Sequence, residues 1–248
     1  MYSILVEPPR TAWDLNWRML SIPVRVHPMF WILTLLLGYR EEDPFQFTLM
    51  FAGVVFVSII VHEFGHALSH RKFGDRNPSV VLYHMGGLCI PGGHALSHWQ
   101  RIQTLLWGPG AGFVLGGIAY GLRWLLFERL QMSNLYLLVL LYDLIWVNVS
   151  WGIVNLMPVF PLDGGQITRE FIHWKKSRLG DRVAFGISMW TAIVLAVGFL
   201  GWHFYKRGED ARGLMVPIFF GILAYNSYRL RKQVIMYGDL GGGDEGPR

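Results

Sequence analysis

The stretch "FTLMFAGVVFVSIIVHEFGH", residues 47–66, decides how this chain folds. Its first fifteen residues are mostly apolar and carry no charge, and a His, a Glu and a second His then follow within five residues. A helix needs about 20 predominantly apolar residues to cross a bilayer. Ionisable groups at membrane depth are costly and usually serve a function. The stretch therefore predicts a membrane helix that carries chemistry at one end.

The composition of the whole chain agrees with a membrane protein. Of the 248 residues 52% are hydrophobic and only 16% are charged, whereas soluble domains carry roughly 25% charged residues. A soluble all-helical protein with a large core fits this composition poorly. The apolar blocks predict an all-α integral membrane protein with about six transmembrane helices, over residues 23–39, 47–66, 102–127, 135–156, 183–204 and 213–228. Residues 1–21 contain no continuous apolar core, so we expect no cleavable signal peptide.

These blocks also predict the domain organisation and the orientation. We expect an interfacial N-terminal segment over residues 1–22, a membrane domain over residues 23–232 and a flexible tail over residues 233–248. Basic residues concentrate at both termini and in the loops after the second and fourth spans. The positive-inside rule places these regions in the cytoplasm, for a multi-pass protein of the cell (inner) membrane. The partner expected from this pattern is the lipid bilayer, and no basic-aromatic interleaving suggests nucleic acid.

The motif His62-Glu63-Phe64-Gly65-His66 has the spacing of a metal site on a helix. Two histidines four residues apart share one helix face, and the Glu between them can reach a metal-bound water. Zinc suits imidazole nitrogens and lowers the pKa of its bound water to about 7. We therefore expect His62 and His66 to bind Zn²⁺ and Glu63 to act as the general base of a hydrolase.

A tetrahedral catalytic zinc needs a third protein ligand and one open position. The segment "NLMPVFPLDGGQ", residues 155–166, is the best source of that ligand. Asn155 ends an apolar block, two prolines interrupt the helix, and Asp163 precedes a pair of glycines. Irregular backbone at membrane depth is tolerated only where it is buried in protein or lines a wet cavity. The second and fourth spans also end on the same side, so Asp163 is the candidate third ligand.

Together these motifs resemble the site-2 protease family of intramembrane zinc metalloproteases. Gly86-Gly87 and Gly108-Pro109 agree with the resemblance, which covers roughly residues 20–230. It implies a three-helix catalytic core made of spans two to four, one Zn²⁺ per chain held by His62, His66 and Asp163, and Glu63 as the catalytic base. It also implies a role for Asn155 at the oxyanion or the substrate carbonyl. Substrates would be membrane-tethered proteins with a transmembrane helix, cut in or near that helix in regulated intramembrane proteolysis.

The chain resembles the minimal members of that family, because it has no room for a PDZ domain or a nucleotide-binding regulatory domain. Control is then expected to come from substrate access or from a separate regulatory protein. Two other functions remain open. One is a membrane zinc transporter, although its ligands would be expected along a transmembrane path. The other is a different membrane zinc peptidase with a downstream Glu as ligand, although neither Glu128 nor Glu170 is expected in a suitable helix.

The segment "PSVVLYHMGGLCI", residues 78–90, predicts a short membrane-associated β-hairpin. Its β-branched and aromatic residues favour a strand, and the glycine pair suits a tight turn. We expect its free edge to pair with unwound substrate, as in strand addition by other recognition domains. The residues expected to bind substrate are Val80, Val81, Leu82, Tyr83, Gly86 and Gly87.

Two structural details are also predicted. Ser97 precedes the third span and is expected to cap its N-terminus. Asp143 lies midway along the fourth span, where a lone carboxylate would be expensive, and Arg123 is its expected partner.

Overall fold

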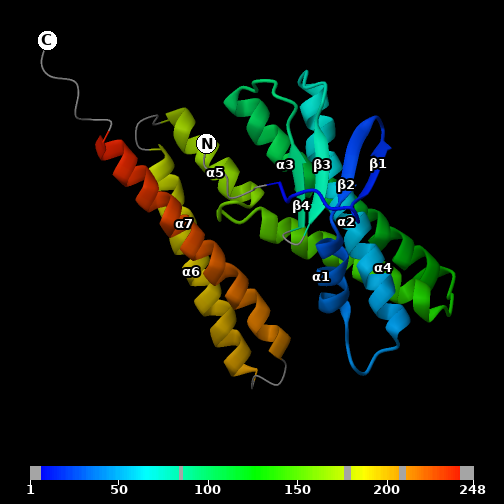
Figure 1. Ribbon diagram of the computed structural model, residues 1–248. Helices are drawn as coiled ribbons and strands as arrows, with labels where there is room; N and C mark the ends of the chain where they lie inside the picture. Colours follow the sequence, from blue (N-terminus) through cyan, green and yellow to red (C-terminus); the bar gives the residue numbers. More distant parts are fainter. Residues whose placement is uncertain (1–6, 84–85, 176–179, 207–210, 241–248) are drawn as a thin grey trace, which may run out of the picture. The chain divides into compact units, whose positions relative to one another are not determined.

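The computed structural model describes residues 7–83, 86–175, 180–206 and 211–240. The chain divides into two compact units, an N-terminal unit from Leu5 to Asn155 and a C-terminal unit that begins at Leu156. Each unit carries part of the predicted chemistry, so each is described by itself. Figure 1 labels their elements.

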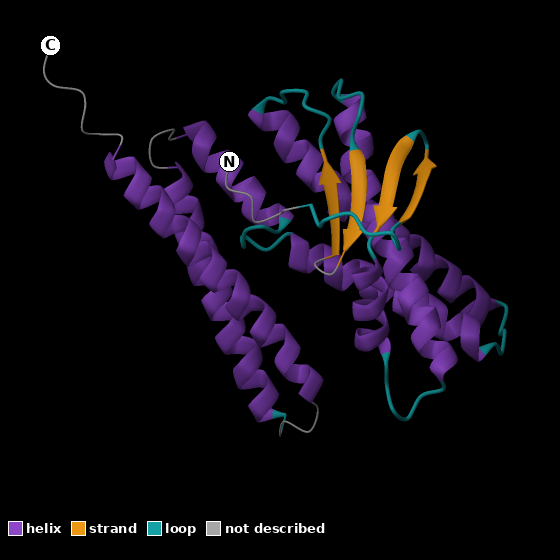
Figure 2. Ribbon diagram, in the orientation of Figure 1, coloured by secondary structure: helices purple, strands orange, loops and turns teal. Residues whose placement is uncertain are grey.

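The N-terminal unit combines a four-stranded sheet with membrane helices. Its strands are β1 (Leu15–Met19), β2 (Ile22–Val26), β3 (Ser79–Tyr83) and β4 (Gly86–Ile90), in that spatial order. β2 and β3 run parallel, and the outer pairs are antiparallel. Figure 2 shows the strands as one layer against the helices. The helices are α1 (Pro28–Gly38), α2 (Phe45–Lys72), α3 (His98–Arg123) with the π-helical turn η1 (Trp124–Arg129), and α4 (Leu135–Asn155).

The core of this unit lies between one face of the sheet and the C-terminal half of α2. Alternation in β2 and β3 places every second side chain on that face, because side chains in a strand point to opposite sides in turn. The buried cluster contains Ile22, Val24, Val26, Val80 and Leu82 from the strands, and Phe30, Ile59, Ile60, Phe64 and Ala67 from α1 and α2. The sheet is therefore held against the helix that carries the His-Glu-His motif.

The hairpin β1–β2 was not predicted from the sequence. Its turn residues Leu20 and Ser21 both have positive φ values, 50° and 65°. Such turns usually contain Asn or Gly, so Leu-Ser gives no turn signal. The Leu20 carbonyl accepts a hydrogen bond from Arg71 at 2.6 Å. The first apolar block, residues 23–39, is consequently split between β2 and α1.

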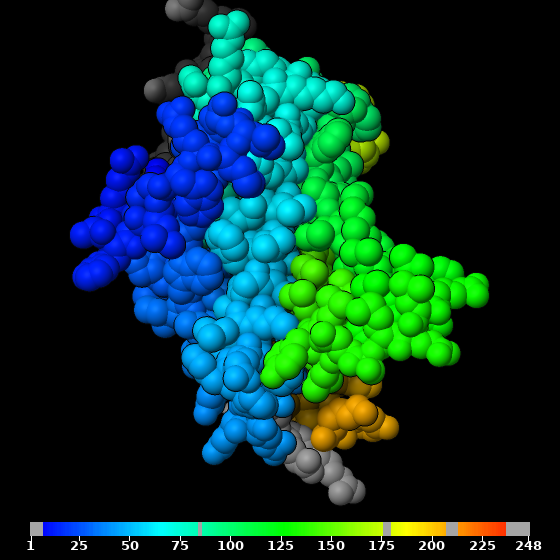
Figure 3. Space-filling model, turned by 90° about the vertical axis from the view of Figure 1, so that its right-hand side faces the viewer, coloured from blue at the N-terminus to red at the C-terminus, as the bar shows by residue number. Residues whose placement is uncertain are grey.

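A buried ion cluster ties the N-terminal segment to the sheet. Arg25 of β2 donates to Asp14 and Glu7, each at 2.9 Å, and to the Pro8 carbonyl. Burial raises the pKa of Asp14, but hydrogen bonds from Thr11 and Arg25 outweigh it and lower this pKa to about 2. The segment expected to be interfacial is thus partly integrated into the fold. Figure 3 shows the N-terminal residues, in dark blue, on the surface beside α2.

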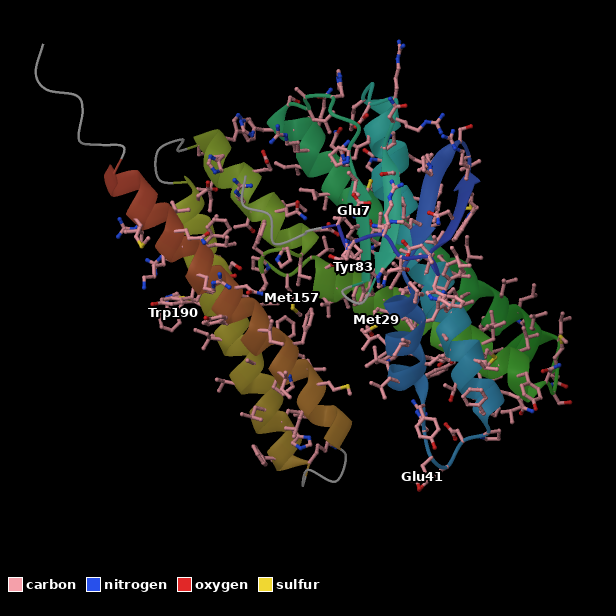
Figure 4. The ribbon with its side chains drawn as sticks, viewed as in Figure 1. Glu7, Met29, Glu41, Tyr83, Met157 and Trp190 are labelled. Atoms are coloured by element: carbon pink, nitrogen blue, oxygen red, sulfur yellow. The ribbon has the colours of Figure 1, made fainter. Side chains whose placement is uncertain are left out.

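The C-terminal unit contains α5 (Asp163–Lys175), α6 (Gly180–Tyr205), the 3-10 turn η2 (Ala211–Leu214) and α7 (Met215–Leu240). α6 and α7 pack along their length (Figure 1), and Trp190 of α6 projects from the pair (Figure 4). The expected flexible tail begins inside α7, which continues to Leu240 because Leu230 and Val234 pack against Phe160 and Phe185. Residues 241–248 of that tail lie outside the described residues.

The predicted helical membrane fold with a short β-hairpin is confirmed, but the described residues contain fewer candidate spans than the six expected. Among the described residues four helices are long and apolar enough to cross a bilayer: residues 45–72, 98–129, 135–155 and 180–205. α1 has 11 residues and rises only about 16 Å, too little for a hydrocarbon core of about 30 Å. α7 is long enough, but it carries Arg229, Arg231 and Lys232 in its second half.

Three details of the sequence analysis are settled by these helices. Ser97 caps α3 in a reciprocal pair with Gln100, as predicted. The pairing of Arg123 with Asp143 was wrong, since Arg123 lies 3.4 Å from Glu128 instead. Glu170 lies in α5 and Glu128 in η1, so the expectation that neither occupies a helix was also wrong.

Candidate metal centre

The His-Glu-His motif lies on the buried part of α2. His62, Glu63 and His66 are all 6% exposed or less. The Nε2 atoms of His62 and His66 are 3.1 Å apart. One helical turn separates the two residues, so both rings project from the same face and their Nε2 atoms converge on one point. The predicted geometry of the histidine pair is therefore present within the N-terminal unit.

A contact from α3 orients the imidazole of His66. Nδ1 of His66 lies 2.8 Å from the backbone carbonyl oxygen of Thr104. Because a carbonyl oxygen can only accept a hydrogen bond, Nδ1 is the donor, and in the neutral imidazole Nε2 then carries the lone pair. The hydroxyls of Thr104 and Ser69 are also hydrogen-bonded, at 3.0 Å, which joins α3 to α2 one turn away. Metal-binding histidines are commonly oriented in this way.

Glycines allow α3 to pass very close to the motif. A Cβ atom at Gly65 would collide with the Trp107 carbonyl, and a Cβ atom at Gly108 would collide with the imidazole of His66. Nε2 of His62 would lie only 2.9 Å from that second Cβ. Gly108 was noted in the sequence only as part of the family resemblance. The structure gives it a physical task, because no larger residue fits beside the two imidazoles.

The base candidate Glu63 lies directly beneath β4. A Cβ atom at Gly87 would collide with the Glu63 carboxylate, so this carboxylate occupies the space that any other residue would fill. Burial raises the pKa of Tyr83, and the negative charge of Glu63 raises this pKa further. Tyr83 lies at the end of β3 (Figure 4). The β3–β4 hairpin therefore covers the base.

The strand edge differs from the predicted one. β3 contains Val80, Val81, Leu82 and Tyr83, and it pairs with β2 on one side and β4 on the other. Its backbone is thus occupied on both sides, and these residues cannot form a free edge. They were expected to do so because the sequence gives no sign of β1 and β2. Among the described residues the free edge beside Glu63 belongs to β4, which contains Gly86 and Gly87.

Asn155 is the last residue of α4 and the last of the N-terminal unit. Its side chain is buried, and its amide nitrogen Nδ2 has no hydrogen-bond partner among the described residues. A buried polar group without a partner is uncommon and costs free energy. Such a donor is suited to bind a hydrogen-bond acceptor on a ligand or substrate.

Asp163 begins α5 in the C-terminal unit and is 7% exposed. The loop before Asp163 packs closely against the first turn of α5. Gly164 lies against the Leu156 and Met157 carbonyls, and Gly165 lies against the backbone of Val159 and Phe160. A Cβ atom at either glycine would collide with that backbone. The two glycines after Asp163 are therefore required by packing.

The residues present fit a zinc ion. Two imidazoles whose Nε2 atoms converge, together with a carboxylate, are a ligand set of known catalytic zinc sites. The Nε2 atoms of the two histidines lie together among buried groups. Zinc is accordingly the cofactor that these donors support.

Comparisons with known proteins agree with this reading. The profile of Peptidase family M50 matches residues 125–199, a range that includes Asn155 and Asp163. "Zinc metalloprotease MJ0392" of Methanocaldococcus jannaschii is 26% identical over 180 residues, covering 72% of this chain and 51% of the relative. "Stage IV sporulation protein FB" of Bacillus subtilis is 24% identical over 224 residues, covering 88% of this chain and 70% of the relative. The resemblance to the site-2 protease family is confirmed.

A solved structure shows the same site-2 protease fold. "Site-2 Protease from Methanocaldococcus jannaschii" matches with a TM-score of 0.60 at 21% identity, covering 88% of this chain and 95% of that one. This chain spans about half the length of the first curated relatives it matches.

Sequence reasoning missed the residues that orient the two motifs. Thr104 orients His66 through a backbone carbonyl, which any residue type supplies, so no sequence signal exists for it. Ser188 accepts a hydrogen bond from the backbone N–H of Phe160, in the segment before Asp163, and Ser227 is hydrogen-bonded to Ser188. Hydroxyls within apolar helices often form hydrogen bonds between helices. The position of Ser188 in an apolar stretch could therefore have indicated such a contact.

Proposed function

We propose that this chain is a zinc endopeptidase that hydrolyses peptide bonds in or near transmembrane segments of membrane-tethered proteins. The observation that carries the proposal is the buried group on α2, where two imidazoles converge within 3.1 Å and a carboxylate lies beside them under a strand edge. Binding alone would not require a carboxylate between the ligands, whereas hydrolysis requires a base there.

The proposed ligands are His62, His66 and Asp163, for one Zn²⁺ per chain. When bound, zinc would act as a Lewis acid and lower the pKa of a water to about 7. The orientation of His66 by the Thr104 carbonyl and the burial of Asp163 support the ligand set. The family resemblance supports it further.

Glu63 is proposed to take the proton of the attacking water and to deliver it to the leaving amine. Its burial beneath β4 keeps the carboxylate away from bulk water, which strengthens its electrostatic interactions. Asn155 is proposed to donate its free Nδ2 hydrogens to the substrate carbonyl as negative charge develops there.

We propose that substrate pairs with the free edge of β4. A membrane substrate arrives as a helix, and pairing with β4 would replace the backbone hydrogen bonds that unwinding removes. The β4 backbone at Gly87 already lies against Glu63, so an added strand would run beside the base. Val80, Val81, Leu82 and Tyr83 then support β4 from behind instead of contacting substrate. Substrates should contain helix-weakening residues near the cut.

The orientation and location are also proposals. α2 ends in His70, Arg71 and Lys72, and the Lys72 ammonium lies 5.3 Å from the Trp107 ring. Basic and aromatic side chains together are typical of a cytoplasmic interface. The proposed catalytic group lies about two to three turns before Lys72, where α2 ends, so cleavage should occur toward the cytoplasmic end of the substrate span. We place the protein in the cell (inner) membrane with both termini in the cytoplasm, under control of a separate regulatory protein.

Substitution of Glu63 by Gln tests this function against zinc transport. Reconstituted Glu63→Gln protein should keep its zinc and lose at least about 100-fold in cleavage rate of a membrane-tethered substrate. A transporter has no need for Glu63 as a proton shuttle, so unchanged zinc flux with no cleavage by wild type would overturn the proposal. Zinc loss in Glu63→Gln would instead make Glu63 a ligand and point to the other membrane zinc peptidases.

A further inference from the structure

The irregular segment between Met157 and Asp163 needs backbone partners from outside itself. The N–H of Val159 bonds to the Met157 carbonyl at 2.7 Å, and the N–H of Leu162 bonds to the Val159 carbonyl at 2.9 Å. Pro161 has no N–H, and its carbonyl accepts from the Gln166 side chain at 3.0 Å. The N–H of Phe160 is bonded to a distant residue, and this bond links the segment to the membrane helices.

Ser188 of α6 supplies that partner. Its Oγ accepts the hydrogen bond from the N–H of Phe160 at 2.7 Å, across 28 positions in the sequence. Ser227 of α7 hydrogen-bonds to the same Oγ, also at 2.7 Å. Ser188 is 2% exposed and Ser227 is fully buried. The two hydroxyls thus join α7, α6 and the segment before Asp163 into one chain of hydrogen bonds within the C-terminal unit.

The hydrogen bond to Ser188 fixes the backbone of this segment in a way that its apolar contacts do not. Phe160 packs edge-on against Phe185 of α6, with ring centroids 5.3 Å apart, but an apolar contact does not determine where the backbone N–H points. A buried N–H without an acceptor is costly, and at membrane depth no water is at hand to replace one. Loss of the Ser188 oxygen would therefore favour a displaced segment. Asp163 is only three residues further along and begins the helix that the segment leads into.

We infer that Ser188 is a positioning residue for the carboxylate of Asp163, with Ser227 as its support. This inference rests on the proposed role of Asp163 as a zinc ligand. Ser188 does not touch the metal in this account. It acts through the backbone of Phe160, and its loss should weaken zinc binding by the intact, folded chain.

Zinc affinity is the quantity to measure, by competition with a chromogenic chelator on purified full-length protein. Ser188→Ala should raise the zinc dissociation constant about tenfold to 100-fold, as is usual for residues that orient metal ligands. Ser227→Ala should have a smaller effect, because the acceptor of Phe160 remains. Ser188→Cys should lie between wild type and Ser188→Ala, since sulfur is a similar-sized but weak acceptor. Thr34→Val is the matched control: Thr34 is equally buried, but its hydroxyl bonds only within α1.

A double-mutant cycle with Asp163→Ala separates positioning from general destabilisation. If Ser188 acts through Asp163, Ser188→Ala should cause no further loss of zinc affinity once Asp163 is removed. An equal loss in both backgrounds, or wild-type affinity in Ser188→Ala, would overturn the inference. Failure of wild type to bind zinc would instead overturn the proposed function. If Ser188→Ala does not fold, the same double-mutant cycle is measured with Ser188→Cys and Asp163→Ala.

Discussion

The two units hold their candidate ligands in opposite ways. In the N-terminal unit, His62 and His66 project from a regular helix, whose spacing alone brings the two rings together. In the C-terminal unit, Asp163 follows an irregular segment whose backbone bonds reach Ser188 and Gln166. A regular helix satisfies its own backbone, whereas an irregular segment in a membrane protein needs partners from elsewhere in the fold. The second arrangement should therefore be more sensitive to changes away from the ligands.

The largest effect is expected from Gly164→Ala. The new methyl group would collide with the Leu156 and Met157 carbonyls, and backbone on both sides of the contact has little freedom to move. We expect zinc affinity to fall by about 100-fold, the upper end of the range for residues that orient metal ligands. The measurement is chelator competition on the purified protein.

Gly198→Ala is the matched control for Gly164→Ala, since a Cβ atom at Gly198 in α6 would have no neighbour within 4 Å. Wild-type zinc affinity in Gly164→Ala would show that the segment relaxes freely, and the contrast between the two units would then fail.

A smaller effect is expected from Gly108→Ala on α3. Here the new methyl group would meet the imidazole of His66, and a side chain can rotate away where backbone cannot. Zinc affinity should fall by about tenfold, at the lower end of the range for residues that orient ligands. Gly110→Ala, two residues along the same helix and with open space around its Cβ, should bind zinc as wild type does. Equal affinities in the two variants would contradict the close approach of α3.

The smallest effect on zinc is expected from Gly87→Ala, which separates the base from the ligands. A methyl group there would displace the Glu63 carboxylate and leave both histidine contacts in place. We expect kcat to fall about tenfold with zinc affinity unchanged, because base catalysis depends on hydrogen-bond reach. The test is to measure the single-turnover cleavage rate and the metal content of Gly87→Ala on the same sample. A parallel loss of zinc would mean that β4 supports the ligands as well as the base.

Much of the fold and the site could be predicted because their signals are local. The apolar blocks, the His-Glu-His spacing, the strand residues of β3 and the cap at Ser97 each depend on residues within one or two turns. The prolines and glycines around Asp163 indicated this residue from local sequence as well. Irregular backbone in a membrane protein is tolerated only where it is buried in protein or lines a cavity. The sequence by itself thus determined a membrane protein with a zinc-type motif, and it identified the residues that we propose carry the chemistry.

Only the tertiary structure decided how those residues are held. The Leu20-Ser21 turn, which makes β3 an inner strand, depends on a distant contact from Arg71. The proton on Nδ1 of His66 depends on a carbonyl of α3, and Glu63 depends on the glycine of a strand. Backbone carbonyls leave no chemical signature in a sequence, and a glycine does not show which distant group will occupy the space beside it. Their effect depends on distances between segments far apart in the chain, and tertiary packing sets those distances.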